Sequence, residues 1–86
     1  MDRETRIKRL YFRSAHRGSK ETDLILGPYA SANLETMNEK ELDEFEAFLA
    51  ENDTDIWYWV VEKSSPEDGK YGVLLTNLRR LYKLKK

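Results

Sequence analysis

Hydrophobic side chains recur every three to four positions near the start of the chain, and basic residues occupy most of the positions between them. This spacing predicts a basic amphipathic helix over residues 3–16. Gly18 can close that helix in the left-handed conformation, and Ser19 can cap a second helix with acidic residues in its first turn. The apolar face of the first helix comprises Ile7, Leu10, Tyr11 and Ser14.

The second helix is expected to present Leu24, Ile25, Tyr29 and Ala32. Gly27-Pro28 lies inside it and should kink it or end one of its turns, because proline cannot donate a backbone hydrogen bond.

A third helix is indicated by the pairs Thr36/Glu39 and Asn38/Glu41, either of which can form a capping box. One face of this helix then carries Leu42, Phe45, Phe48 and Leu49.

Residues 56–61 combine β-branched and aromatic side chains, which by local preference favour a strand. A six-residue strand would have no partner in a sequence that otherwise predicts helices, so we expect a short buried helix capped by Asp53 or Thr54. A loop over Ser64 to Gly69 and a last helix from about Tyr71 to Lys83 complete the pattern. The inward residues of that helix are Leu74, Leu75, Leu78, Leu81 and Tyr82.

The predicted fold is an all-α bundle of about five helices. Its 86 residues form one domain, 1–86, in which a basic tail over about 83–86 is expected to be disordered. The absence of cysteine excludes disulfides, thiolate nucleophiles and cysteine-ligated metals. The charged start does not look like a secretory signal and no apolar run is long enough to span a bilayer, so we expect a cytoplasmic protein.

Charge is distributed unevenly along the chain. Residues 1–20 carry a net charge of +5, residues 21–68 carry −12 and residues 69–86 carry +6. The basic ends can therefore pair with the acidic middle inside the fold, or they can bind differently charged surfaces of a partner.

Groups that suit catalysis are few. His16 is the only histidine, and none of the four glycines belongs to a phosphate-binding loop. Glu39, Asp43 and Glu46 fall on the outer side of the third helix, where a solvated face is the simpler interpretation. Trp57 and Trp59 suit a core better than a stacking site for bases or flavin. The sequence therefore predicts no enzyme, no metal site and no cofactor of its own.

The segment His16 to Asp23 is typical of a corner between two helices, and these residues alone require no function. However, Arg17-Gly18-x-x-Glu21 followed by Asp23 resembles the R-G-x-x-E motif of the succinate dehydrogenase flavinylation factors, called SdhE in bacteria. The later blocks Leu24 to Pro28, Leu42 to Phe45 and Asp53 to Trp59 follow in the order typical of that family, and so does the closing leucine-rich helix. The resemblance covers about residues 5–82.

The resemblance implies a small five-helix, chaperone-like factor, expected to be a monomer when free. Members bind the flavoprotein subunit of succinate dehydrogenase and promote covalent attachment of FAD to it, so the FAD belongs to the client. Fumarate reductase flavoprotein is a further candidate client. The expected contact residues are His16, Arg17, Gly18, Glu21 and Asp23. Two positions depart from the pattern: His16 stands where many members carry arginine, and Thr22 where leucine is common.

Two other function classes stay open. A nucleic-acid-binding protein would use the basic first helix and the basic end of the chain, although the acidic middle would repel phosphates. A protein that carries FAD would use the tryptophans, although it would lack a phosphate-binding loop.

Overall fold

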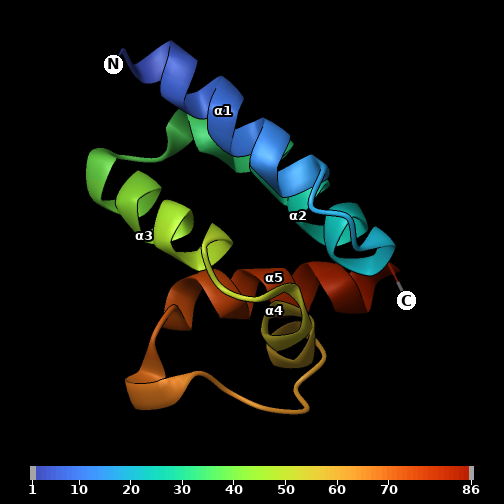
Figure 1. Cartoon of the computed structure of the whole chain (residues 1–86). Helices are drawn as coiled ribbons and strands as arrows, with labels where there is room; N and C mark the ends of the chain where they lie inside the picture. Colours follow the sequence, from blue (N-terminus) through green and yellow to red (C-terminus); the bar gives the residue numbers. More distant parts are fainter. Residues whose placement is uncertain (1, 86) are drawn as a thin grey trace.

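The computed structural model describes residues 2–85, which form five α-helices and two short 3-10 helices with no strand among them (Figure 1). The all-α prediction is confirmed. In the described part of the chain, no helix is both long and apolar enough to cross a bilayer. The elements are α1 (Arg3–Ala15), α2 (Lys20–Asn33), η1 (Leu34–Thr36), α3 (Glu39–Leu49), α4 (Asp53–Val60), η2 (Glu67–Gly69) and α5 (Gly72–Lys85).

Helices α1 and α2 form a hairpin and lie side by side along most of their length (Figure 1). Small residues at the seam permit this close packing. A Cβ placed on Gly27 would lie 3.4 Å from the Cβ of Ala15. Ser14 is fully buried, and its hydroxyl donates to the Leu10 carbonyl at 2.7 Å, so this buried polar group has a partner.

The buried stripe of the hairpin differs from the predicted one. Tyr11 is 43% exposed, Leu24 is 56% exposed, and Ala32 is also exposed. Ile25 and Tyr29 are buried as predicted, and the other buried residues of α2 are Thr22, Leu26, Gly27 and Ala30. Pro28 does not end the helix: α2 continues through it to Asn33, and Pro28 lies on the exposed side.

The start of α3 has the predicted capping box, at the second of the two candidate pairs. The Asn38 side chain accepts from the Glu41 N–H at 2.8 Å, and the Glu41 carboxylate accepts from the Asn38 N–H at 2.9 Å. Helix α4 is capped by Asn52, whose side chain accepts from the Thr54 N–H at 2.8 Å, so the prediction of Asp53 or Thr54 as the cap was wrong. An Asn-Asp-Thr-Asp run offers several caps, and only the backbone geometry selects one.

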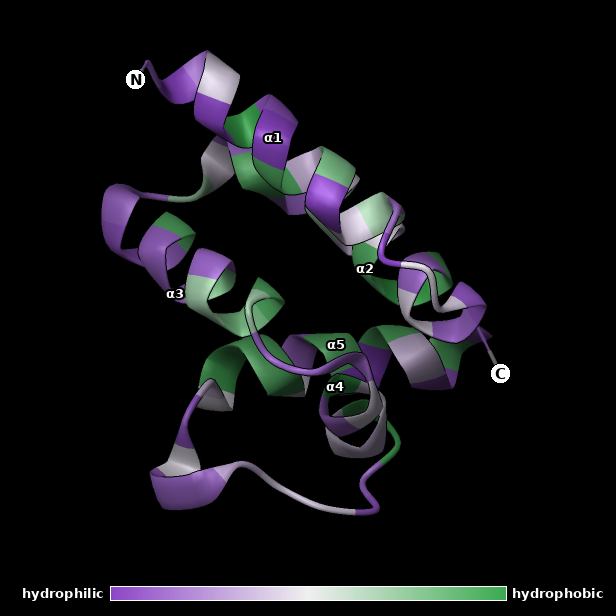
Figure 2. Cartoon of the chain, viewed as in Figure 1, coloured by the Kyte–Doolittle hydropathy of each residue, from purple (hydrophilic) through white to green (hydrophobic). Residues whose placement is uncertain are grey.

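The core lies where α2, α3, α4 and α5 meet, and the green, apolar sides of these helices turn toward that region (Figure 2). Phe45, Phe48, Leu26, Ile56 and Leu78 are all almost completely buried. Burial of Ile56, Trp59 and Val60 against neighbouring helices explains why residues 53–60 are helical despite their strand-like composition, since tertiary packing outweighs local preference.

The connection from α4 to α5 is anchored by Tyr71. Its ring packs edge-on against Phe48, with 5.1 Å between ring centroids, and its hydroxyl donates to the Glu51 carboxylate at 2.7 Å. Helix α5 begins at Gly72 and continues to Lys85, two residues beyond the predicted end, and Lys86 lies outside the described residues.

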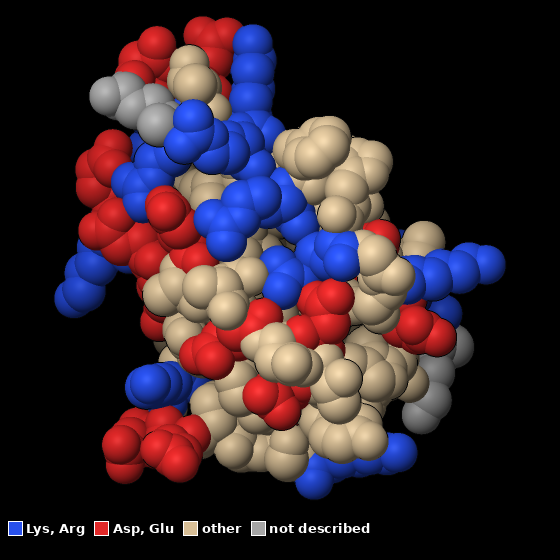
Figure 3. Space-filling view, viewed as in Figure 1, with Lys and Arg blue, Asp and Glu red and all other residues tan. Residues whose placement is uncertain are grey.

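Part of the charge asymmetry is neutralised inside the molecule. The Arg6 guanidinium of α1 contacts the carboxylates of Glu39, Asp43 and Glu46 on α3, at 2.9, 2.6 and 3.0 Å. Donation to Asp43 raises the pKa of this guanidinium above its already high ordinary value, so Arg6 stays charged. The outer face of α3 is therefore an ion-paired surface rather than a merely solvated one (Figure 3).

Candidate functional site

The five predicted contact residues gather at the turn between α1 and α2, but they do not share one environment. His16, Gly18 and Glu21 are exposed, whereas Arg17 and Asp23 are partly buried. The corner thus has an exposed outer layer and a partly buried supporting layer that consists of Arg17 and Asp23. The sequence motif alone does not distinguish the two layers.

Arg17 belongs to the supporting layer, since its side chain is only 12% exposed. Nη1 donates to the Leu49 carbonyl at 2.7 Å, Nη2 donates to the Glu51 carbonyl at 3.0 Å, and Nε is paired with the Asp53 carboxylate. Because the two carbonyls lie at the C-terminal end of α3, where backbone acceptors lack helical partners, the planar guanidinium ties the corner to the α3–α4 connection.

Asp23 supports the turn from within α2. Its carboxylate accepts from the Arg17 N–H at 2.8 Å. Ser19 occupies the N-cap position of α2 but makes no capping hydrogen bond with its side chain. Arg17 and Asp23 therefore hold the backbone of the turn in place, and their side chains already have partners within the chain.

Gly18 is at the tip of the turn with φ at +99°. A side chain there would be strained, because L-residues rarely adopt this backbone conformation. A Cβ at this position would nevertheless have no heavy atom within 4 Å, apart from its chain neighbours, so the surface next to Gly18 is open.

An exposed aromatic pair flanks the corner. The His16 ring lies 4.5 Å from the ring of Phe12, centroid to centroid, at an interplanar angle of 36°. Phe12 itself is 64% exposed.

A groove adjoins the corner on the side of Glu21. It has a volume of about 400 Å³ and lies between α2, α4 and the end of α5. The sequence pattern does not predict this groove, although Leu24 lies three residues after Glu21 and so on the same face of a helix. The residues that line it are Glu21, Leu24, Ile25, Trp57, Tyr82 and Lys85.

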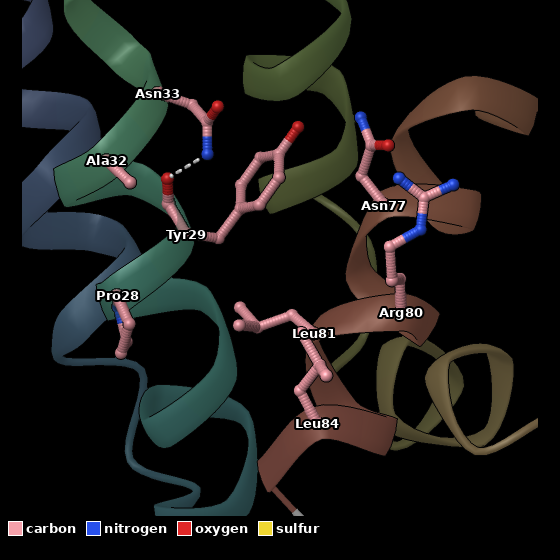
Figure 4. A pocket seen from close by; sticks show the side chains of 8 residues that line it. All are labelled: Pro28, Tyr29, Ala32, Asn33, Asn77, Arg80, Leu81 and Leu84. Atoms are coloured by element: carbon pink, nitrogen blue, oxygen red, sulfur yellow. Dashed lines mark hydrogen bonds between the residues drawn. The ribbon is translucent and has the colours of Figure 1, made fainter.

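A second hollow of about 330 Å³ lies between α2 and α5 (Figure 4). Leu81 and Leu84 project into the space beside Pro28, and the Asn33 side chain donates to the Tyr29 carbonyl at 2.9 Å. Burial raises the pKa of the Tyr29 hydroxyl, so this group is neutral at physiological pH. Arg80 is the one charged residue among those that line this hollow, and the arrangement does not single out a ligand.

Among residues 2–85, no three or more His, Asp or Glu side chains are grouped so that they could hold a metal ion.

Comparison with known proteins identifies the family. The model of a family described as flavinator of succinate dehydrogenase matches residues 8–82. A relative from Yarrowia lipolytica is 39% identical over 82 residues, which covers 91% of this chain and 57% of the relative. A relative from Candida glabrata is 48% identical over 60 residues, which covers 67% of this chain and 39% of the relative.

A third relative, from Mycosarcoma maydis, is 44% identical over 61 residues, covering 71% of this chain and 26% of the relative. All three are named mitochondrial succinate dehydrogenase assembly factor 2. The chain spans between about a quarter and just over half of the length of these relatives. Because the family model covers nearly the whole bundle, including the corner at Gly18, the chain belongs to the flavinator family of succinate dehydrogenase.

Proposed function

We propose that this chain binds the flavoprotein subunit of a succinate dehydrogenase and promotes covalent attachment of FAD to that subunit. Membership of the flavinator family supports this proposal, as do relatives named as assembly factors of the same enzyme. The chain then acts as a chaperone-like factor rather than as an enzyme, and the flavin and its chemistry stay with the client.

The observation that carries the proposal is the open surface at Gly18. None of residues 2–85, apart from its chain neighbours, comes within 4 Å of a Cβ placed on this glycine, while Arg17 and Asp23 hold the turn from beneath. A fixed backbone turn without a side chain allows the backbone of another protein to approach closely. Glu21 is exposed beside it and can accept hydrogen bonds from that partner.

Such binding promotes flavin attachment only if the factor binds one conformation of the client more tightly than the others. We infer that the favoured conformation is the one in which the flavin site is closed and preorganised. The corner then works by shifting the population of client molecules toward that conformation.

Two glycines allow a matched test. Gly18 and Gly69 both have positive φ, +99° and +68°, and a Cβ on either would meet no heavy atom within 4 Å. Gly69→Ala should therefore lose about 1–2 kcal/mol of stability from backbone strain, and Gly18→Ala somewhat more, because +99° lies outside the left-handed region that L-residues enter. Only Gly18→Ala should reduce covalent FAD on the flavoprotein, measured by in-gel flavin fluorescence in cells that lack the native gene.

Two results would count against the proposal. One is normal covalent FAD in cells without the gene. The other is wild-type flavinylation by folded Gly18→Ala and Glu21→Ala variants, since the corner would then have no role in contacting the client.

Three narrower predictions accompany the proposal. We expect the free factor to be a monomer, and fumarate reductase flavoprotein to be a further candidate client. A cytoplasmic location also stays a prediction, because the relatives are named as mitochondrial proteins.

A further inference from the structure

The groove between α2, α4 and α5 combines apolar lining residues with one acidic and one basic residue. Leu24 projects into it from α2, and Trp57 forms the opposite wall with its ring edge-on to Tyr82, at 5.5 Å between centroids and 85° between planes. Glu21 and Lys85 provide an acidic and a basic group among the lining residues. Across the described residues, neither of these two charged groups forms an ion pair within the chain.

The exposure of Leu24 is unusual for its surroundings. Its neighbour Ile25 is 4% exposed, whereas more than half of the Leu24 side chain faces solvent. A leucine in that position adds little to the stability of the free domain, although burial by a partner would remove its apolar surface from water. Aromatic and aliphatic side chains in a concave, partly desolvated position are typical anchors at protein interfaces.

We propose that this groove binds one large apolar side chain of the flavoprotein client, with a basic residue of the same client segment facing Glu21 and an acidic residue facing Lys85. This inference rests on the proposed function. Glu21 belongs to both the corner and the groove, and Leu24 follows it by one helical turn, so a partner that covers Gly18 and Glu21 lies next to Leu24.

The chemistry of the groove favours a protein segment over free FAD. The pyrophosphate of FAD requires several hydrogen-bond donors or cations, and it would meet the Glu21 carboxylate here. A volume of about 400 Å³ is near the lower end of the range of ligand pockets, about 300–1,000 Å³, and suits one or two side chains.

The test uses the full chain and the purified apo-flavoprotein subunit of succinate dehydrogenase as the probe. Binding is measured by titration calorimetry for the wild type, Leu24→Ala and Leu24→Asp. The matched controls are Val73→Ala and Val73→Asp, because Val73 is a 76% exposed apolar residue of α5 that lies outside the groove. Circular dichroism melting of each variant confirms that it is folded.

We expect Leu24→Asp to weaken binding at least tenfold and Leu24→Ala several-fold, while both Val73 variants stay within about twofold of the wild type. Binding of the wild type should also change the fluorescence of Trp57, and this change should be absent in Trp57→Phe. These results together would support the groove as a docking site for the client.

The outcomes separate this inference from the proposed function. If the wild type binds the flavoprotein and Leu24→Asp binds equally well, the groove is not part of the interface, although the proposed function stands. If the wild type does not bind, both the proposed function and this inference fail. If Leu24→Asp binds the client normally but no longer self-associates or no longer binds FAD, then the groove has a different occupant. That result would overturn the inference.

Discussion

At the scale of single residues, Arg17 carries more of the structure than its place in a surface turn suggests. It donates to two carbonyls at the end of α3 and pairs with Asp53 at the start of α4, so one side chain joins three elements. A cation that only suited the end of α1 would contribute about 0.3–1 kcal/mol. The observed contacts imply a larger contribution, since hydrogen bonds from charged groups are stronger than neutral ones.

Arg17→Ala should therefore lower the free energy of unfolding by about 2–3 kcal/mol. In a domain of this size that loss corresponds to a fall in melting temperature on the order of 10–20 °C, measurable by circular dichroism. Arg17→Lys should fall in between, because lysine keeps the charge without the planar fork. Glu21→Ala provides the exposed control, within about 0.5 kcal/mol of the wild type. Equal melting temperatures for Arg17→Ala and Glu21→Ala would contradict this assignment.

The pKa of the Tyr71 hydroxyl predicts how the free energy of unfolding changes at alkaline pH. Burial, together with donation to the Glu51 carboxylate, raises the pKa of its hydroxyl from 10.0 to about 12. The unfolded chain therefore releases this proton at lower pH than the folded chain does. The stabilisation that the protonated Tyr71 hydroxyl gives to the folded state is fully present below pH 10 and is lost as the pH rises toward about 12.

Urea unfolding of the wild type between pH 9 and 12 measures this effect, with Tyr71→Phe as the matched control. The variant keeps the ring packing against Phe48 but has no proton to release. We expect the difference in unfolding free energy between the two proteins to shrink as the pH increases. A difference that is independent of pH would show that Tyr71 does not titrate in this way.

At the scale of elements, the end of α4 is closed by a motif that usually contains glycine. The Lys63 N–H donates to the Tyr58 carbonyl at 2.8 Å and the Glu62 N–H donates to the Trp59 carbonyl at 3.3 Å, the pattern of a Schellman motif. The residue in the left-handed conformation is Glu62, with φ at +65°. Its carboxylate also lies 3.3 Å from Lys83 on α5, in an exposed ion pair.

Glu62→Gly should raise the free energy of unfolding by about 0.5–1 kcal/mol, because glycine adopts positive φ without strain and exposed ion pairs contribute little. Glu62→Gln isolates the ion pair, since it removes the charge and retains the strained backbone. Denaturant unfolding of both variants measures the two effects. If Glu62→Gly is less stable than the wild type, then the ion pair with Lys83 outweighs the backbone strain.

At the scale of the whole molecule, opposite charges that are separated in sequence meet in the folded chain. Arg3 and Arg6 of α1 are held against the acidic face of α3, and Arg3 also donates to the Glu35 carbonyl at 3.1 Å. Lys8 of α1 is also paired, with Glu4 at 3.3 Å, and on the face that Figure 3 displays basic and acidic side chains lie next to one another. The basic first helix is therefore a weaker attractor for phosphates than its composition indicates.

Nucleic-acid binding should accordingly be weak. In fluorescence anisotropy with an arbitrary 20-base-pair duplex at about 150 mM salt, we expect a Kd no tighter than the nonspecific range of about 10⁻⁴–10⁻⁶ M. Lowering the salt should strengthen the binding, as for any contact with phosphates. Submicromolar affinity at about 150 mM salt would reopen the nucleic-acid-binding alternative.

The sequence by itself determined the helices, because periodicity and caps are local properties. The pattern Leu42, Phe45, Phe48 and Leu49 defines one face of α3 wherever that helix lies, and the Asn38/Glu41 capping box forms between residues three apart. The motif around Gly18 likewise indicated both a helix corner and a resemblance to the flavinylation factors.

Only the tertiary structure decided which residues of that motif face outward. Arg17 and Glu21 are both charged residues in one turn, yet Arg17 is directed to acceptors that lie more than 30 positions later in the sequence. The apolar residues Leu24 and Ile25 are adjacent and both line the groove, yet Leu24 is largely exposed and Ile25 is buried, because the angle at which α2 packs on its neighbours sets the edge of the core. Periodicity shows that a helix has an apolar side, but only its packing against other helices determines how much of that side remains exposed.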